Sequence, residues 1–214
     1  MEILDQSVAA EVADKLLEIQ AIRLQPDKPF TWASGWKSPI YCDNRLSLSF
    51  PNVRNLIKDQ LVRAVCHFFP DAEAIAGVAT AGIPQGALIA NDLGLPFIYV
   101  RSKAKGHGME NMIEGKIVSG QKVVVVEDLI STGGSSLKAV QDLRDAGFEV
   151  LGMVAIFTYG FDIAAKNFAD TNVKLICLSN YEALLPRAVH QNYIDDKALT
   201  SLSEWRKDPG SWNP

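Results

Sequence analysis

Two neighbouring carboxylates at the end of a strongly apolar run are the first candidates for chemistry in this sequence. Residues 122–126 read KVVVV, which predicts a buried strand, and Glu127 and Asp128 follow it directly. Charges beside a buried strand lower stability unless they have a partner or a ligand. Carboxylates do not bind phosphate, but they suit sugar hydroxyl groups or a Mg²⁺ ion reached directly or through water. The pair is therefore predicted to bind a sugar or a metal ion.

The carboxylates lead into a short loop of hydroxyl side chains and glycine. Its members are Leu129, Ile130, Ser131, Thr132, Gly133, Gly134 and Ser135. Glycine lets the backbone approach a ligand closely, and consecutive N–H groups at a helix start bind phosphate. A plain strand-to-helix turn with a Ser or Thr cap is the alternative interpretation. The sequence has neither the lysine of a Walker motif nor the GxGxxG spacing of dinucleotide sites, so those two phosphate motifs are excluded.

A second candidate is the basic segment RSKAKGHG at residues 101–108. It places Arg101, Lys103, Lys105 and the titratable His107 within seven residues, with glycine at positions 106 and 108. In a protein with a net charge of −4, such a segment attracts a polyanion locally, and its glycines allow it to move. A solvated basic loop beside a strand end is the alternative.

A third candidate is the turn that follows the apolar run at residues 74–79. Thr80, Ala81 and Gly82 are small, so their backbone N–H groups can reach an anion. A turn between a strand and a helix, without any ligand, is equally compatible with this local sequence.

The candidate segments all follow predicted strands. Apolar runs at residues 74–79, 97–100, 122–126, 149–157 and 173–178 predict strands, and predicted helices at 51–69, 83–93 and 135–146 alternate with them. This alternation predicts an α/β fold with a mostly parallel, twisted sheet and helices on both faces. In open parallel sheets ligands bind beyond the carboxyl ends of the strands, where the loops 79–84, 101–116 and 127–135 begin.

The two ends of the chain differ from this core. Residues 5–20 have a helical period with Asp5 or Ser7 as its cap, and residues 24–50 are rich in turn formers and aromatic side chains. We expect one domain over residues 1–214, with a core at about 51–180 and a small cap formed by about 1–50 and 181–214.

Composition narrows the classes of function. The net charge of −4 and the pI of about 5.4 argue against binding DNA or RNA. Three scattered cysteines, Cys42, Cys66 and Cys177, indicate reduced thiols, and the acidic, amphipathic N-terminus is unlike a signal peptide. The longest apolar runs are too short to span a bilayer. We therefore expect a cytoplasmic protein without nucleic-acid or membrane partners.

Two of these segments resemble those of known enzymes. The stretch VVVVEDLISTGGSS at residues 123–136 resembles the 5-phosphoribosyl diphosphate signature of type I phosphoribosyltransferases. The pattern RxKxKxHG at 101–108, followed by IEG at 113–115, is similar to the mobile catalytic loop of orotate phosphoribosyltransferases. That resemblance implies the type I phosphoribosyltransferase fold and Mg²⁺-dependent transfer of the 5-phosphoribosyl group from 5-phosphoribosyl diphosphate to orotate. The products would be orotidine 5′-monophosphate and diphosphate, in de novo UMP biosynthesis.

The resemblance also implies roles for individual residues. Catalytic roles fall on Arg101, Lys105, His107 and Asp128. The phosphoribosyl diphosphate site would comprise these four together with Thr80, Ala81, Gly82, Glu127, Leu129, Ile130, Ser131, Thr132, Gly133, Gly134 and Ser135. Ser131 would also contact orotate, and Mg²⁺ would be held mainly by the substrate, with Asp128 reaching it through water.

Some positions depart from the family pattern. Some relatives use a lysine on orotate where this chain has Ala33, so Arg45 or Lys37 is the expected substitute. Many relatives read Arg-Lys at the start of the basic loop, whereas here the extra charge stands at Lys103, which receives no role. The family further implies a homodimer with shared active sites, in which this loop closes over the site of the neighbouring subunit.

Two other functions are compatible with the same phosphoribosyl signature. One is a phosphoribosyltransferase for a purine base or uracil, and the RxKxKxHG pattern argues against it. The other is a regulator that senses phosphoribosyl diphosphate while binding nucleic acid, and the acidic pI of about 5.4 argues against that function. Competition between bases and a gel-shift assay distinguish these alternatives.

Overall fold

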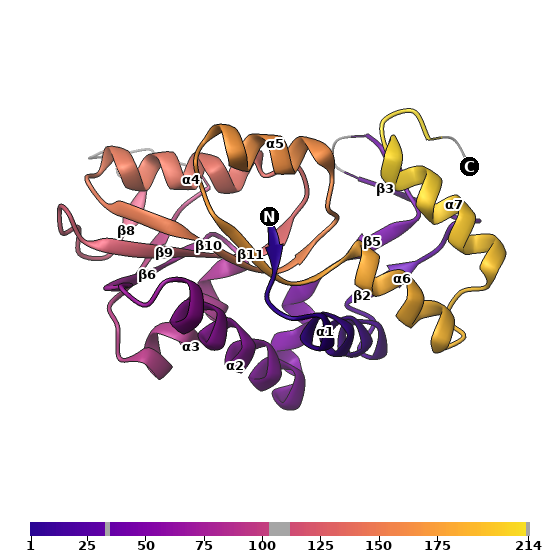
Figure 1. Ribbon diagram of the computed structural model, residues 1–214, viewed down its shortest axis with the longest axis horizontal. Helices are drawn as coiled ribbons and strands as arrows, with labels where there is room; N and C mark the ends of the chain where they lie inside the picture. Colours follow the sequence, from indigo (N-terminus) through magenta and orange to yellow (C-terminus); the bar gives the residue numbers. More distant parts are fainter. Residues whose placement is uncertain (33–34, 103–111, 213–214) are drawn as a thin grey trace.

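The computed structural model describes residues 1–32, 35–102 and 112–212, and its centre is a seven-stranded sheet (Figure 1). The order is β1-β11-β10-β9-β6-β7-β8. The strands are β1 (Glu2–Ile3), β6 (Ala74–Val78), β7 (Phe97–Val100), β8 (Ile113–Glu114), β9 (Lys122–Ile130), β10 (Glu149–Thr158) and β11 (Leu175–Asn180). Only the β7–β8 pair of this sheet is antiparallel. The predicted α/β fold with a mostly parallel sheet is confirmed.

Helices cover both faces of this sheet (Figure 1). On one face lie α1 (Gln6–Glu18), α2 (Pro51–Phe68) and α3 (Gly82–Leu93), and on the other lie α4 (Gly134–Asp145) and α5 (Asp162–Asp170). Local sequence explains their ends: Asp5 caps α1, Pro51 opens α2, and Gly94 ends α3 with a left-handed φ of 65°. No described helix is both long and apolar enough to cross a membrane.

Strand β9 is longer than its sequence predicted. The four valines that follow Lys122 are fully buried, and β10 continues beside the strand as far as the register pair of Thr158 with Ile130. Glu127 and Asp128 therefore belong to the strand, and the expected loop at 127–135 shrinks to residues 131–133 before α4 begins. Pairing with β10 overrides the break that two charged residues suggested.

The remaining elements form the cap. It contains β2 (Ile22–Leu24), β3 (Phe30–Thr31), β4 (Lys37–Ser38), β5 (Ile40–Cys42), the 3₁₀ helix η1 (Asn44–Ser49), α6 (Tyr181–His190) and α7 (Asp196–Lys207). Figure 1 shows the N-terminal strands beside α6 and α7 at one end of the sheet. Trp205 of α7 is fully buried, crosses the Trp32 ring edge-on, and donates its indole N–H to the Lys37 carbonyl oxygen at 3.2 Å. The N- and C-terminal segments thus stabilise one another.

The first residues of the chain do not lie in this cap. Strand β1 pairs with β11 in the main sheet, and the apolar side of α1, with Val12 and Leu16, is buried in the core. Residues 2–18 therefore pack on the central sheet through β1 and the amphipathic face of α1, and the side chain of Asp14 also joins α1 to Arg187 of α6.

Candidate active site

A pocket of about 450 Å³ opens at the carboxyl ends of β6, β7 and β9. Its walls come from four parts of the chain: Cys42, Asp43 and Arg45 of the cap; Val78, Ala79, Thr80 and Ala81; Arg101, Ser102 and Met112; and Glu127, Asp128, Leu129, Ser135, Lys138, Ala139 and Asp142. This is the position at which open parallel sheets bind ligands.

The carboxylates of Glu127 and Asp128 lie deep in this pocket. Glu127 is 7 % exposed, and its two oxygens accept from the Asp128 backbone N–H and the Ser136 hydroxyl, both at 3.0 Å. Burial, together with the neighbouring Asp128 charge, raises the pKa of Glu127 to about 8. Burial also raises the pKa of Asp128, against the opposing effects of its hydrogen bonds and the Arg45 guanidinium. Donors such as sugar hydroxyl groups, or a cation, would stabilise the charged form of this pair.

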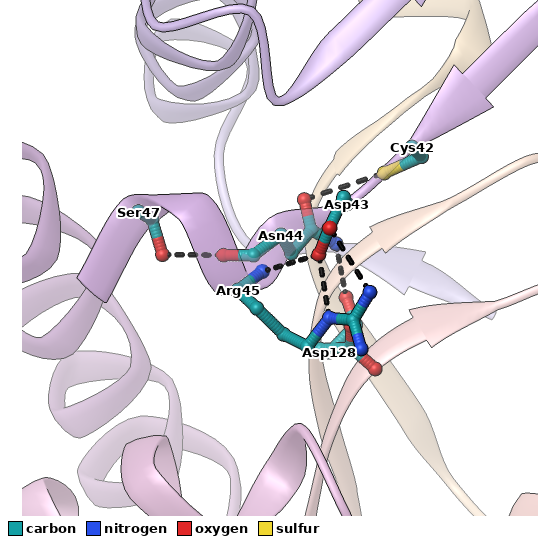
Figure 2. A network of polar contacts seen from close by, with 6 residues as sticks. All are labelled: Cys42, Asp43, Asn44, Arg45, Ser47 and Asp128. Carbon is teal, nitrogen blue, oxygen red and sulfur yellow. Dashed lines mark hydrogen bonds and ion pairs between the residues drawn. The ribbon is translucent and has the colours of Figure 1, made fainter. Parts of the chain in front are cut away.

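The cap brings a cation to the pocket wall beside Asp128. The guanidinium of Arg45 donates from Nε to Oδ1 of Asp43 at 2.6 Å and from Nη2 to Oδ2 at 2.9 Å. Figure 2 shows this pair beside Asp128, whose carbonyl oxygen accepts from the Asn44 side chain at 2.7 Å. The planar, bidentate pair orients the guanidinium of Arg45 on the pocket wall, and the Asp43 carboxylate balances its charge.

The turn between β9 and α4 has the geometry of a phosphate site. Gly133 has a left-handed φ of 81° and caps α4 without a side chain, which leaves the first-turn N–H groups facing the turn. A Cβ at this position would lie 2.7 Å from the Phe168 ring, so only glycine fits. The Thr132 carbonyl oxygen accepts from the Asn167 side chain at 2.9 Å, and the Ile130 carbonyl oxygen accepts from the Thr158 hydroxyl at 3.1 Å.

The turn between β6 and α3 supplies the third wall. Thr80 and Ala81 line the pocket, and the Ala79–Thr80 peptide bond is cis. Gly82 packs beneath them, where a Cβ would lie 2.3 Å from the Val126 carbonyl oxygen. Position 82 requires glycine because α3 lies so close to β9 there. This close packing places the turn before α3 at the pocket.

The pocket brings together many of the residues that sequence singled out. Those lining it are Arg45, Thr80, Ala81, Arg101, Glu127, Asp128, Leu129 and Ser135. Residues 131–134 form the adjoining turn and the start of α4, and Ile130 ends β9. Lys37 is not among the lining residues: it stands on β4, where its ammonium group donates to the Thr31 hydroxyl at 3.0 Å. Lys103, Lys105 and His107 lie outside the described residues.

Three polar side chains that hold the site were not anticipated from sequence. They are Asn44, Ser136 and Asn167, whose partners Asp128, Glu127 and Thr132 are 84, 9 and 35 residues away along the chain. No local motif marks such pairs, because they form only when the chain is folded.

The carboxylates can be compared with the needs of a metal ion. Within residues 1–32, 35–102 and 112–212, no group of three or more His, Cys, Asp or Glu side chains is arranged to hold a metal. The carboxylate of Asp128 fits a Mg²⁺ ion reached through water, whose direct ligands would come mainly from a bound diphosphate.

Comparisons with known proteins agree on one family. The family described as "Phosphoribosyl transferase domain" matches residues 55–186. The chain is 63 % identical over 202 residues to an orotate phosphoribosyltransferase of Cytophaga hutchinsonii, covering 94 % of this chain and 97 % of that one. Its fold is similar to a solved orotate phosphoribosyltransferase of Aeropyrum pernix, with a TM-score of 0.75, 30 % identity, and coverage of 84 % and 98 %.

A further solved structure of similar fold contains a bound ligand. It is an orotate phosphoribosyltransferase of Mycobacterium tuberculosis in complex with 5-phospho-α-D-ribosyl 1-diphosphate. The TM-score is 0.65 at 25 % identity, with coverage of 83 % of this chain and 98 % of the other.

Proposed function

The chain belongs to the orotate phosphoribosyltransferases, and on that premise we propose that it transfers the 5-phosphoribosyl group from 5-phosphoribosyl diphosphate to orotate. The products are orotidine 5′-monophosphate and diphosphate, so the enzyme serves UMP biosynthesis. The observation that carries this proposal is the pocket itself, which places a buried carboxylate pair, a glycine-capped helix start and Arg45 around one cavity.

The reaction requires the protein to position two substrates and stabilise charge. N1 of orotate attacks C1 of the ribose and releases its proton to the departing diphosphate, which leaves with the electron pair of the broken bond to C1. The transition state resembles an oxocarbenium ion. Asp128 and Glu127 accept hydrogen bonds from the ribose hydroxyl groups, and the N–H groups around residues 131–135 hold the 5′-phosphate. This arrangement is supported by the burial of the carboxylates and by the helix start beside them.

The leaving diphosphate needs positive charge. Arg101 lines the pocket and its guanidinium contacts the Glu114 carboxylate at 3.3 Å, so it is held near the opening. Lys105 and His107 complete this cationic group in the proposal, together with the N–H groups of residues 80–82. Asp128 would help to hold a bound Mg²⁺ ion through water, and such an ion, held mainly by the substrate, would supply positive charge to the diphosphate.

Orotate carries a carboxylate that also needs a partner. We assign it to Arg45, whose guanidinium lies on the pocket wall and is oriented by Asp43, with Ser131 as a further contact. Lys37 is less suited, because its ammonium group already contacts Thr31 outside the pocket lining.

Assembly and location follow from the family and the thiols. We propose a homodimer with shared active sites, in which the basic loop of one subunit serves the other, and sedimentation velocity tests it. The described cysteines are all free thiols, which supports a cytoplasmic enzyme.

A spectrophotometric assay tests the proposed reaction. Orotate absorbance should fall when 5-phosphoribosyl diphosphate and Mg²⁺ are both present, and it should stay constant when either is omitted. Uracil and adenine, offered at equal concentration, should not compete. Consumption of one of these bases in place of orotate would overturn the assignment of the base.

A further inference from the structure

Two asparagine side chains from outside the substrate-binding turns hold main-chain carbonyl groups at the edge of the site. The Nδ2 of Asn44, in η1 of the cap, donates to the Asp128 carbonyl oxygen at 2.7 Å (Figure 2). The Nδ2 of Asn167, in α5, donates to the Thr132 carbonyl oxygen at 2.9 Å. The first bond reaches strand β9, which carries the proposed sugar-binding carboxylates. The second reaches the turn of residues 131–133, the proposed phosphate turn.

The hydrogen bond from Asn44 forms at the part of β9 that extends beyond its pairing with β6. The last register pair between β6 and β9 joins Gly77 to Val126, and Asp128 lies two residues further on. On its other side β9 stays paired with β10 as far as Ile130. The strand is therefore fixed by the sheet, and the bond from Asn44 positions the cap segment against it.

Asn44 is itself held in one orientation. Its side chain is 2 % exposed, and its Oδ1 accepts from the Cys42 thiol at 3.3 Å. Its main-chain carbonyl oxygen accepts from the Ser47 hydroxyl at 2.6 Å. With the amide oriented in this way, Nδ2 bonds the Asp128 carbonyl oxygen (Figure 2). The next residue, Arg45, is thereby kept among the residues that line the pocket.

Asn167 supports the other half of the site. Helix α5 packs directly behind the phosphate turn, since a Cβ on Gly133 would lie 2.7 Å from the ring of Phe168. The adjacent Asn167 bonds the carbonyl oxygen of Thr132 in the same turn. This turn is short and lies between a strand and a helix, so one fixed carbonyl orients the N–H groups that follow it.

We propose that Asn44 and Asn167 are positioning residues for different substrates of the proposed reaction, on which this inference rests. Asn44 sets the cap segment that carries Arg45 against orotate, and Asn167 sets residues 131–133 against the 5′-phosphate. Neither side chain lines the pocket, so both act through the groups they hold. A purely structural role would lower stability or the active fraction without changing one Michaelis constant selectively.

Steady-state kinetics of two single variants separate these roles. Asn44→Ala raises the KM for orotate by roughly fivefold or more and changes the KM for 5-phosphoribosyl diphosphate by less than about twofold. Asn167→Ala has the opposite effect: it raises the KM for 5-phosphoribosyl diphosphate by roughly fivefold or more and changes the KM for orotate by less than about twofold. Asn52→Ala, at an exposed position of α2, is the matched control and leaves both constants unchanged.

Calorimetry gives a second readout without turnover. The Kd of 5-phosphoribosyl diphosphate rises in Asn167→Ala and stays at the wild-type value in Asn44→Ala. If an alanine variant fails to fold, Asn44→Ser and Asn167→Ser replace it, because a serine hydroxyl is too short to reach either carbonyl group. If a variant is active and its KM values for the two substrates change equally, or not at all, the positioning roles of Asn44 and Asn167 are overturned and the proposed function stands. If the wild-type protein binds no 5-phosphoribosyl diphosphate, the proposed function and the positioning roles of Asn44 and Asn167 are both overturned.

Discussion

The buried carboxyl group of Glu127 makes stability depend on pH in a defined direction. Between its ordinary pKa of 4.5 and about 8, the folded protein keeps the Glu127 proton, whereas the unfolded chain has lost it. The free energy of unfolding therefore falls as pH rises through this window, and the loss is complete above about pH 8. Glu127→Gln removes the titrating group, so the variant gains stability over the wild type as pH rises.

The magnitude follows from the size of the pKa change. A rise from 4.5 to about 8 corresponds to about 5 kcal/mol of unfolding free energy. The window from pH 4.5 to pH 8 covers only part of this change, because the unfolded chain is half titrated at its lower end and the folded protein is half titrated at its upper end. At pH 8 we therefore expect Glu127→Gln to exceed the wild type by on the order of 3 kcal/mol, relative to the difference at pH 4.5. The glutamine side chain can still pair with the Ser136 hydroxyl and the Asp128 N–H, so the fold is preserved.

Urea denaturation at several pH values between 4.5 and 8.5, followed by tryptophan fluorescence, measures this difference. Glu149→Gln, at an exposed position on the neighbouring strand β10, is the matched control and should show no such trend. A stability difference between Glu127→Gln and the wild type that is constant over the whole range would refute the argument. It would mean that Glu127 is charged in the folded protein at neutral pH.

Three further outcomes are expected. Lys105→Ala lowers turnover at least tenfold and leaves the fold intact. The reason is that losing a charged contact to the leaving group removes about 3 kcal/mol of transition-state stabilisation. Normal turnover in steady-state assays would contradict this role. Arg45→Ala raises the KM for orotate about tenfold, measured by initial rates, since a charge-assisted contact is lost; an unchanged value would exclude Arg45 as the carboxylate partner. Gly82→Ala lowers the free energy of unfolding by about 3 kcal/mol, because its Cβ would lie 2.3 Å from the Val126 carbonyl oxygen. Gly134→Ala, where the nearest atom is 4.0 Å away, is its control in urea denaturation and should change stability by less than about 1 kcal/mol.

Local sequence alone determined the main elements and the glycine-containing turn between β9 and α4. Four consecutive valines before Glu127 predicted a buried strand, and the hydroxyl and glycine residues after Asp128 predicted a ligand-binding turn. Pro51 marked the start of α2 and Gly94 the end of α3, both as observed. These features depend on backbone preference and on side chains within a few residues, so they can be predicted without knowing the partners of each segment.

Only the tertiary structure decided how the site is assembled. Pairing with β10 extended β9 to Ile130, and burial between strand and helix raised the pKa of Glu127. Packing of the cap placed Arg45 on the pocket wall and Lys37 outside it, although both are basic residues of one segment. The bond between Asn44 and Asp128 spans 84 residues of sequence. Strand register, burial and contacts between distant residues arise from the packing of whole elements, and no local pattern encodes them.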